Sequence, residues 1–107
     1  MDKVKKVFIS GPIRNIPNNN QEMFDNCERN LISLGYDVFN PTWMKFGDSW
    51  ERKDILDIDL TALAACDAIC YLPGWENADG CKLENIYATN LNKDVLYFDG
   101  ESVIIGE

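Results

Sequence analysis

Residues 67–98, DAICYLPGWENADGCKLENIYATNLNKDVLYF, predict a strand, a helix and a second strand. The first six residues are apolar almost throughout, which is typical of a central parallel strand covered on both faces. Pro73 and Gly74 end this strand, a helix is expected over about residues 80–91, and DVLYF at 94–98 predicts the next strand. Strands joined by a helix in this way form right-handed crossovers, so the stretch indicates a parallel sheet.

The rest of the chain continues the same alternation of strands and helices. Further strands are expected at residues 4–10, at 36–40 and, at the sheet edge, in SVIIG near the C-terminus, with helices at about 19–34 and 51–65. The predicted fold class is therefore α/β, a single-domain flavodoxin-like or Rossmann-like parallel sheet of four or five strands with helices on both faces. Residues 1–107 are expected to form one domain, because a chain of this length fits a single core.

Each predicted helix also has a candidate N-terminal cap. Asn19 with Glu22 matches a capping box for the first helix, Asp48 or Glu51 could cap the second, and Asp79 is a good N-cap residue for the third.

Charge and hydropathy exclude several classes of partner. Eighteen acidic against ten basic side chains give a net charge of −8, which would repel polymeric nucleic acid, although a small nucleotide is possible where local cations meet it. No apolar run approaches the roughly 20 residues of a membrane span, so no membrane partner is expected. The N-terminal sequence lacks the pattern of a secretory signal, which favours the cytoplasm.

The cysteine and histidine content narrows the chemistry. Four cysteines, none in a CxxC pair, are expected to be free thiols in a reducing compartment. Histidine is absent, which removes the commonest zinc ligand and the usual proton shuttle at neutral pH. We therefore expect no metal and no cofactor, and acid–base chemistry that uses carboxylates, Lys, Tyr or Cys. Neither a dinucleotide-binding GxGxxG nor a GxxxxGK[ST] phosphate loop occurs.

Three loops follow the carboxyl ends of the predicted strands and should meet at one crevice, where ligands bind in such folds. The first is GPIRNIPNNN (residues 11–20), the second is PTWMKFGDSW (41–50), and the third is PGWENADG (73–80). The second loop is unusually aromatic.

Three carboxylates lie near this crevice, and each has an ordinary structural explanation beside a functional one. Glu84, in the first turn of the third predicted helix, could simply complement the helix dipole, and Asp79 could simply cap that helix. Asp59 lies about 70° from the centre of the apolar stripe of its helix, on the shoulder of the buried face, where a carboxylate needs a partner or a raised pKa. Asp54 points about 150° away and is expected to be solvated.

Aromatic and cationic side chains near the crevice also have two interpretations. Trp75 follows the break after the third strand and could cover the sheet end or form a wall for a flat ligand such as a nucleobase. Arg14 and Lys82 could be ordinary surface charges or could face an anionic group on a substrate.

The segments VFISGPIRN, DLTALAACDAICYLPGW and ADGCKLENIYATNLNKDVLYF together resemble the nucleoside 2-deoxyribosyltransferase-like superfamily. The resemblance is greater to its small branch that is often met in phage genomes, and it covers nearly the whole chain. The LPGWE motif and the helix that bears Glu84 are its most specific part.

The resemblance implies roles for the carboxylates. Glu84 matches the Glu that attacks the anomeric carbon of a 2'-deoxynucleoside and forms a glycosyl-enzyme. Asp59 matches an Asp that protonates the base or positions the sugar. Asp79 is the nearest counterpart of a second Asp before the nucleophile, at a spacing one residue shorter.

The resemblance also implies substrate-binding residues. Phe8 takes the place of a Tyr that orients the nucleophile, and it cannot donate a hydrogen bond. The GPIR segment is similar to relatives that hydrolyse deoxynucleoside 5'-monophosphates, in which Ser10 and Arg14 would hold the phosphate. Substrate contacts are expected from these residues together with Gly11, Trp75 and Gly80.

The expected function is cleavage or transfer at the N-glycosidic bond of a 2'-deoxynucleoside or its 5'-monophosphate, with Glu84 as the nucleophile. Two carboxyl groups suffice for a reaction through an oxocarbenium-like transition state: a carboxylate stabilises the sugar on one face, and a carboxylic acid protonates the leaving base on the other side. The alternative from another class is a module that binds or sequesters a nucleotide without chemistry, and a third is a purely structural oligomerisation partner. We expect a homo-oligomer, because the family builds its sites at subunit contacts and because the aromatic loop is rich for a monomer's surface.

Overall fold

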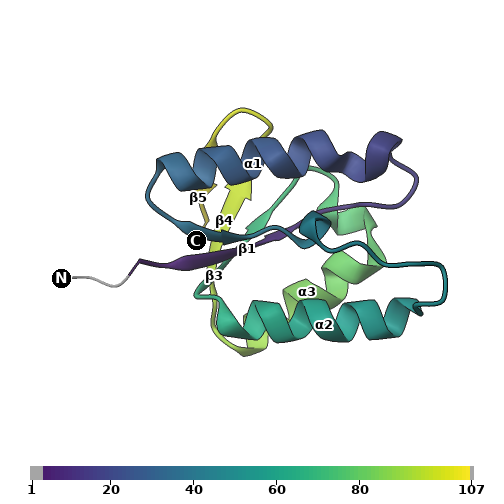
Figure 1. Cartoon of the computed structure of the whole chain (residues 1–107). Helices are drawn as coiled ribbons and strands as arrows, with labels where there is room; N and C mark the ends of the chain where they lie inside the picture. The colour runs from purple at the N-terminus through teal and green to yellow at the C-terminus, as the bar shows by residue number, and fades with distance from the viewer. Residues whose placement is uncertain (1–3, 107) are drawn as a thin grey trace.

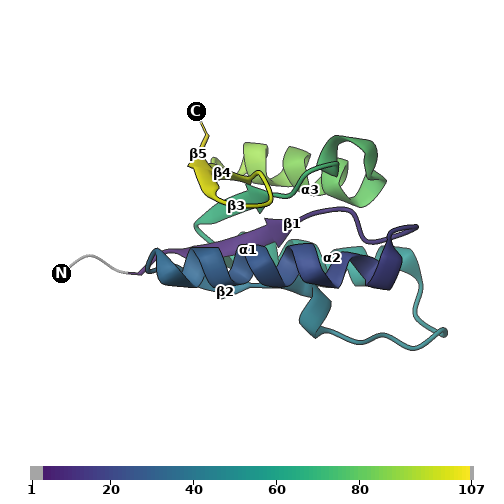
Figure 2. The same cartoon turned by 90° about the horizontal axis from the view of Figure 1, so that it is seen from above.

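The computed structural model describes residues 4–106, and a five-stranded sheet with helices on both faces organises them (Figure 1). The strands and helices are β1 (Lys6–Ser10), α1 (Gln21–Ser33), β2 (Asp37–Phe39), α2 (Arg52–Ala65), β3 (Ala68–Tyr71), α3 (Asp79–Asn90), β4 (Asp94–Phe98) and β5 (Val103–Ile105). The strand order is β2-β1-β3-β4-β5, and Figure 2 shows the strands side by side behind α1. β1 to β4 are parallel, whereas β5 pairs antiparallel to β4. The predicted fold class is confirmed.

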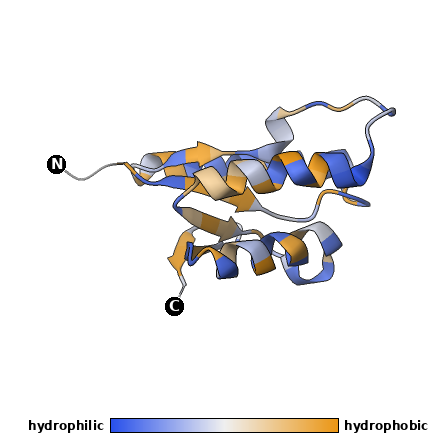
Figure 3. Ribbon diagram, turned by 90° about the horizontal axis from the view of Figure 1, so that it is seen from below, coloured by the Kyte–Doolittle hydropathy of each residue, from blue (hydrophilic) through white to orange (hydrophobic). Residues whose placement is uncertain are grey.

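The side chains of β1 point alternately to the two faces of the sheet, and so they contribute to two separate layers of the core. Val7 and Ile9 pack on the side of α1 with Phe24, and Phe8 packs on the other side with Leu63 of α2. Figures 1 and 2 show the same division, with α1 on one face of the sheet and α2 and α3 on the other. Hydrophobic residues dominate the strands in Figure 3, while the helices mix both kinds. Successive strand side chains point to opposite faces, so a strand covered on both sides is apolar throughout.

The topology places a switch point between β1 and β3. From β1 the chain reaches β2 through α1 on one face, and from β2 it reaches β3 through α2 on the other face. Loops that leave the carboxyl ends of two such strands diverge, and the crevice between them is where ligands bind in open α/β sheets.

The predicted caps of α1 and α3 are wrong, and only the position of the cap predicted at Glu51 is confirmed. α1 begins at Gln21 after three consecutive asparagines in the left-handed region, Asn18, Asn19 and Asn20 (φ 52°, 54° and 61°), and no side chain caps it. Asp79 is the first residue of α3, its N-cap is Ala78, and the Asp79 carboxylate makes no capping bond. Glu51 does occupy the N-cap of α2, but its side chain does not accept a capping hydrogen bond either.

The cysteines agree with the prediction. All four are buried and free, and the thiols of Cys27 and Cys70 lie 3.7 Å apart in the core. Within residues 4–106, no helix has the length and apolar character needed to cross a membrane.

Candidate active site

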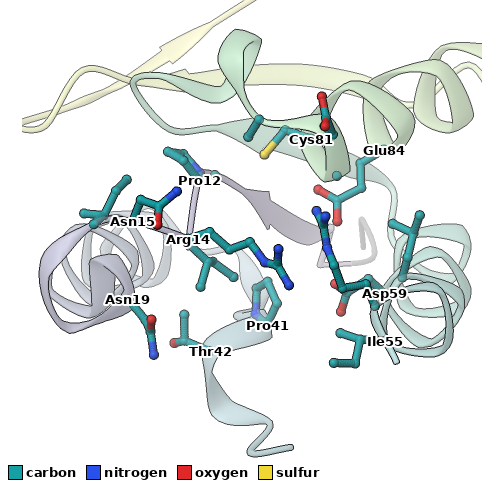
Figure 4. Close-up of a pocket in the computed structure, with 18 of the residues that line it drawn as sticks. Pro12, Arg14, Asn15, Asn19, Pro41, Thr42, Ile55, Asp59, Cys81 and Glu84 are labelled. Carbon is teal, nitrogen blue, oxygen red and sulfur yellow. The ribbon is translucent and has the colours of Figure 1, made fainter. Parts of the chain in front are cut away.

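A cavity of about 1190 Å³ opens at the carboxyl ends of β1 and β3 (Figure 4). Each of the three predicted loops contributes to its lining: the first through residues 11–16, the second through 41–42 and 44–46, and the third through 73–74 and 77–80. α2 and α3 complete it on one side. The predicted convergence of the loops is therefore observed, and it follows from the position of β1 and β3 at the switch point.

Glu84 projects from α3 into this cavity and is only 6% exposed. Its Oε1 accepts a hydrogen bond of 2.6 Å from the hydroxyl of Ser10 at the end of β1. Burial raises the pKa of Glu84 to about 8; the Ser10 hydrogen bond opposes this rise and the nearby charge of Asp59 adds to it. Since α3 begins at Asp79, Glu84 lies in the second helical turn and not in the predicted first, so burial outweighs the helix dipole here.

Asp59 reaches the same cavity from α2. Within the described chain its Oδ1 is buried and has no hydrogen-bond partner. Desolvation raises the pKa of Asp59 to about 6, as expected for a carboxyl group removed from water without a compensating partner. The prediction that Asp59 lies on the shoulder of the buried face with a raised pKa is confirmed. An unpartnered buried oxygen that faces a cavity is suited to a hydrogen bond with a ligand.

The cavity is richer in cations than the chain as a whole. It is lined by four of the ten Lys and Arg residues but by only three of the eighteen acidic ones. The four cations are Arg14, Lys45, Arg52 and Lys53. Of these, only Lys53 forms an ion pair in residues 4–106, with Glu51 and Asp54. Figure 4 shows the guanidinium of Arg14 extending toward the side of the cavity where Asp59 and Glu84 lie.

Gly11 and Gly80 line the cavity as expected, and so does Asp79. The Asp79 carboxylate is exposed, however, and lies 3.8 Å from the ammonium group of Lys82. It therefore resembles a surface charge more than a buried acid. Lys82, which could have faced an anion, is not among the lining residues of the described chain.

Three predicted substrate contacts lie outside the cavity lining: Phe8, Ser10 and Trp75. Phe8 is fully buried and stacks on Phe39 with ring centroids 5.6 Å apart. Trp75 stacks on Tyr71 with ring centroids 4.2 Å apart and packs against the core, as expected for the first of its two interpretations, a cover over the sheet end. Ser10 is 1% exposed and its hydroxyl donates to Glu84, so its predicted contact with a phosphate stays a prediction.

Sequence reasoning missed a polar network that fixes the second loop. Asn40 is completely buried; its amide group donates to Asp25 and Glu28, at 3.2 and 2.9 Å, and its carbonyl oxygen accepts from the backbone N–H and hydroxyl of Thr42. Every polar atom of the Asn40 side chain is thereby paired, which makes such a network rigid. It holds Pro41 and Thr42 against the cavity. The only signal in the sequence was an Asn directly before Pro at the end of a strand.

No cluster of three or more His, Cys, Asp or Glu side chains able to hold a metal ion occurs in residues 4–106. The donor set of the cavity is instead two carboxyl groups with raised pKa values, several cations and backbone groups at the start of α3. Such a set suits a polar anionic organic molecule whose reaction needs one carboxylate and one carboxylic acid.

A sequence model of one protein family, described as a domain of unknown function (DUF4406), matches residues 5–97. The chain belongs to the DUF4406 family. A search of curated proteins gave no match.

Solved structures with a similar fold include two 2-deoxyribosyltransferases. That of Leishmania mexicana has a TM-score of 0.68 at 24% identity, over 88% of this chain and 63% of the other. That of Bacillus psychrosaccharolyticus has a TM-score of 0.68 at 23% identity, over 94% and 77%. A CMP N-glycosidase of Clostridium botulinum has a TM-score of 0.61 at 19% identity, over 87% and 67%. This DUF4406 chain thus has the fold of the 2-deoxyribosyltransferases, and it spans less than two thirds of the length of the Leishmania enzyme.

Proposed function

We propose that the protein cleaves or transfers the N-glycosidic bond of a 2'-deoxynucleoside or its 5'-monophosphate, with Glu84 as nucleophile and Asp59 as the acid that protonates the leaving base. The observation that carries the proposal is the presence of two carboxyl groups with raised pKa values on one cavity, at the switch point of the sheet. Environments that shift the pKa values of two neighbouring carboxyl groups by different amounts are typical of active sites in which one group acts as an acid and the other as a nucleophile or base. The similar folds of two deoxyribosyltransferases and an N-glycosidase support the same reaction class.

In the first step, a carboxylate oxygen of Glu84 forms a bond to the anomeric carbon while the bond from that carbon to the base nitrogen breaks. The bonding electrons leave with the base, which takes the proton of Asp59. In the second step, water or a second base attacks the anomeric carbon and passes a proton to Asp59, and the ester to Glu84 breaks. The double-displacement route retains the configuration of the sugar.

The pair must hold one proton between its members for this reaction. Burial raises the pKa of Glu84 to about 8 and that of Asp59 to about 6, so the singly protonated pair predominates between these values. Because the pKa of Glu84 is the higher of the two, the shared proton belongs mainly to Glu84, whereas attack requires it on Asp59. We therefore expect a bell-shaped pH dependence whose maximum lies near neutrality, with only a fraction of the pair in the reactive arrangement.

The cations favour a phosphorylated substrate. An acidic chain that gathers four cationic side chains around one cavity is suited to an anionic ligand, and Arg14 projects across the space beside the carboxyl pair. The Ser10 hydroxyl is buried and bonded to Glu84, which leaves Arg14 as the principal candidate for the phosphate contact.

Chromatography of released bases tests the reaction. The wild-type protein is incubated with a panel of deoxynucleosides, ribonucleosides and their 5'-monophosphates, with and without a second free base. Base release from at least one deoxy substrate is expected, and formation of a new nucleoside in the presence of the second base distinguishes transfer from hydrolysis. Tight binding without any turnover across the panel would contradict the proposal.

Arg14→Ala tests the phosphate preference separately. Loss of one charge-assisted phosphate contact, worth about 1.5–3 kcal/mol, should lower kcat/KM for the monophosphate about 10- to 100-fold relative to that for the nucleoside. Arg29→Ala, on the exposed side of α1, is the matched control. An unchanged ratio of the two kcat/KM values in Arg14→Ala would remove the phosphate from the proposal while leaving the reaction intact.

A binding module without chemistry is the second candidate, favoured by one observation. The pKa of Glu84 lies above that of Asp59, which is the reverse of the order that attack by Glu84 requires. Calorimetric binding of a nucleotide with no product would support this function, whereas multiple turnover would eliminate it.

A further inference from the structure

The Ser10 hydroxyl occupies an unusual place beside the proposed active site. Ser10 is the last residue of β1, and in that strand it points to the same face as Phe8, toward α2 and α3. It does not line the cavity, yet its Oγ lies 2.6 Å from Oε1 of Glu84, which does. This distance is within the range of a short, charge-assisted O–H···O bond. Ser10 therefore contacts Glu84 from the end of β1 and is not among the described residues that line the cavity.

We propose that Ser10 is the positioning residue of Glu84, holding one carboxylate oxygen so that the other faces the cavity and stabilising the ionised form that attacks the sugar. This inference rests on the proposed function. The aromatic side chain at position 8, where the resemblance places an orienting Tyr, carries no donor and is stacked on Phe39. The structure places a hydroxyl two residues further along the same face of the same strand.

Ser10 is itself held rigidly, which a positioning residue requires. In the parallel pairing of β1 with β3 it is the partner of Tyr71, and its carbonyl accepts a 2.8 Å bond from the backbone N–H of Leu72. The Glu84 side chain has three rotatable bonds, and one fixed donor removes much of this freedom. A bond to a rigid strand end thus orients Glu84 more closely than a bond to a loop would.

Other titratable groups around Glu84 cannot replace this donor. Asp59 faces it from α2, has no hydrogen-bond partner at Oδ1 within residues 4–106, and raises the pKa of Glu84. Burial raises the pKa of Cys81, on the same helix, to about 12, and also raises the pKa of Tyr71 on β3. The Tyr71 hydroxyl donates to Asn85 at 2.6 Å and is thus already engaged.

From the first loop, Arg14 also approaches this side of the cavity, but no ion pair joins it to Glu84 in residues 4–106. The other lining cations, Lys45, Arg52 and Lys53, are exposed side chains from the second loop and the start of α2. Among the described side chains, the Ser10 hydroxyl is accordingly the one hydrogen-bond donor to Glu84.

Ser10→Ala should therefore raise the pKa of Glu84. A hydrogen bond to a charged group contributes about 1.5–3 kcal/mol, which corresponds to about one to two pKa units. One to two pKa units correspond to a factor of about 10 to 100 in the fraction of the singly protonated pair that has Glu84 ionised. The maximum of kcat should therefore drop about 10- to 100-fold. The alkaline limb of the pH profile should move upward by the same one to two units, while KM changes little.

The test combines a titration that needs no activity with the pH profile. Carboxyl ¹³C NMR gives the pKa of Glu84 in the wild type, Ser10→Ala, Ser10→Thr and Ser10→Cys. Alanine should raise it, threonine should restore it by returning a hydroxyl, and cysteine, a weak donor of similar size, should give an intermediate value. Ser33→Ala, which removes an exposed hydroxyl bonded to the backbone carbonyl of Asn30, is the control and should leave it unchanged.

Two outcomes would overturn the inference. One is an unchanged pKa of Glu84 in both Ser10→Ala and Ser10→Cys. The other is a fall in kcat without movement of the alkaline limb, which would indicate a structural role only. If the wild type releases no base, the proposed function fails, but the titration still decides whether Ser10 controls the ionisation of Glu84. Should alanine prevent folding, the cysteine and threonine variants supply the same comparison.

Discussion

At the scale of single residues, burial distinguishes the two central carboxyl groups from the other acidic side chains of the chain. Eighteen Asp and Glu residues are present, and Glu84 is the one acidic side chain among those described that is almost fully buried. Removal from water disfavours the charged form of an acid, which is why the pKa values of Glu84 and Asp59 rise. The same burial that prepares Glu84 for chemistry should destabilise the folded protein wherever Glu84 is ionised.

The first prediction concerns the stability of Glu84→Gln. Because the pKa of Glu84 is raised by folding from its usual 4.5 to about 8, the unfolded chain binds fewer protons between these values, and the stability of the wild type falls as pH rises through them. Glutamine removes this dependence. The free energy of unfolding of Glu84→Gln should therefore rise relative to that of the wild type as the pH rises from 5 to 8, and this difference should change by on the order of 2–3 kcal/mol.

Urea unfolding of both proteins at the two pH values measures this difference. Glu76→Gln, at an exposed position of the third loop, is the control and should follow the wild type. A constant difference between Glu84→Gln and the wild type at both pH values would show that Glu84 does not titrate with a raised pKa.

At the scale of elements, the close approach of strand ends shapes the cavity. A Cβ atom at Gly11 would lie 2.5–2.8 Å from three side-chain carbons of Leu72, so glycine is required where β1 leaves the sheet beside β3. Leu72 is fully buried and has little room to move. The carboxyl end of β1 therefore depends on the absence of a side chain at position 11.

The second prediction follows from this contact. Gly11→Ala should destabilise the fold by about 1–3 kcal/mol, as overpacking of a core does, and should distort the cavity beside it. Gly47→Ala is the matched control, because nothing lies within 4 Å of a Cβ at that position, and its effect should stay within about 0.5 kcal/mol. Chemical unfolding of the three proteins provides the comparison. Equal stability of Gly11→Ala and Gly47→Ala would mean that Leu72 repacks without loss.

Element order and loop convergence could be predicted from the sequence because both depend on hydropathy patterns and on the rules of parallel sheets. The backbone conformation of the segment that leads into α1 could not be predicted in this way. Its capping box matched a sequence signature, but the backbone places Asn18, Asn19 and Asn20 in the left-handed region, which asparagine tolerates better than most residues. The NNN run was the available signal, and the capping signature competed with it.

At the scale of the whole molecule, side-chain direction decided which site predictions agreed with the structure. Asp59 was predicted from helical spacing and Glu84 from its place near the start of the helix after the third strand, and both line the cavity. Phe8 and Ser10 were assigned as substrate contacts by motif position, yet they point into the layer between the sheet and α2 and α3. A motif gives the place of a residue along a strand, whereas its contacts depend on packing that only coordinates show.

The third prediction concerns assembly. Trp43 and Trp50 of the second loop are 53% and 50% exposed, and Phe46 packs edge-on against Trp50 beside the cavity. We expect this aromatic surface to be covered by a second copy of the chain, since exposed apolar clusters of this kind mark contact sites. Light scattering at micromolar concentration should report a dimer or larger species, and Trp50→Ser should weaken it. A monomer at all accessible concentrations would contradict the expectation.

The most direct test of the central claim is the rate of base release by Glu84→Gln relative to the wild type. It is measured at pH 7 by chromatography, on whichever deoxynucleoside or monophosphate the wild type cleaves best. If Glu84 attacks the sugar, the amide should reduce kcat by at least about 1000-fold, in line with the loss of a nucleophile, while the variant stays folded. A rate within a few-fold of the wild type would contradict the assignment of Glu84 and, with it, the account of the cavity given above.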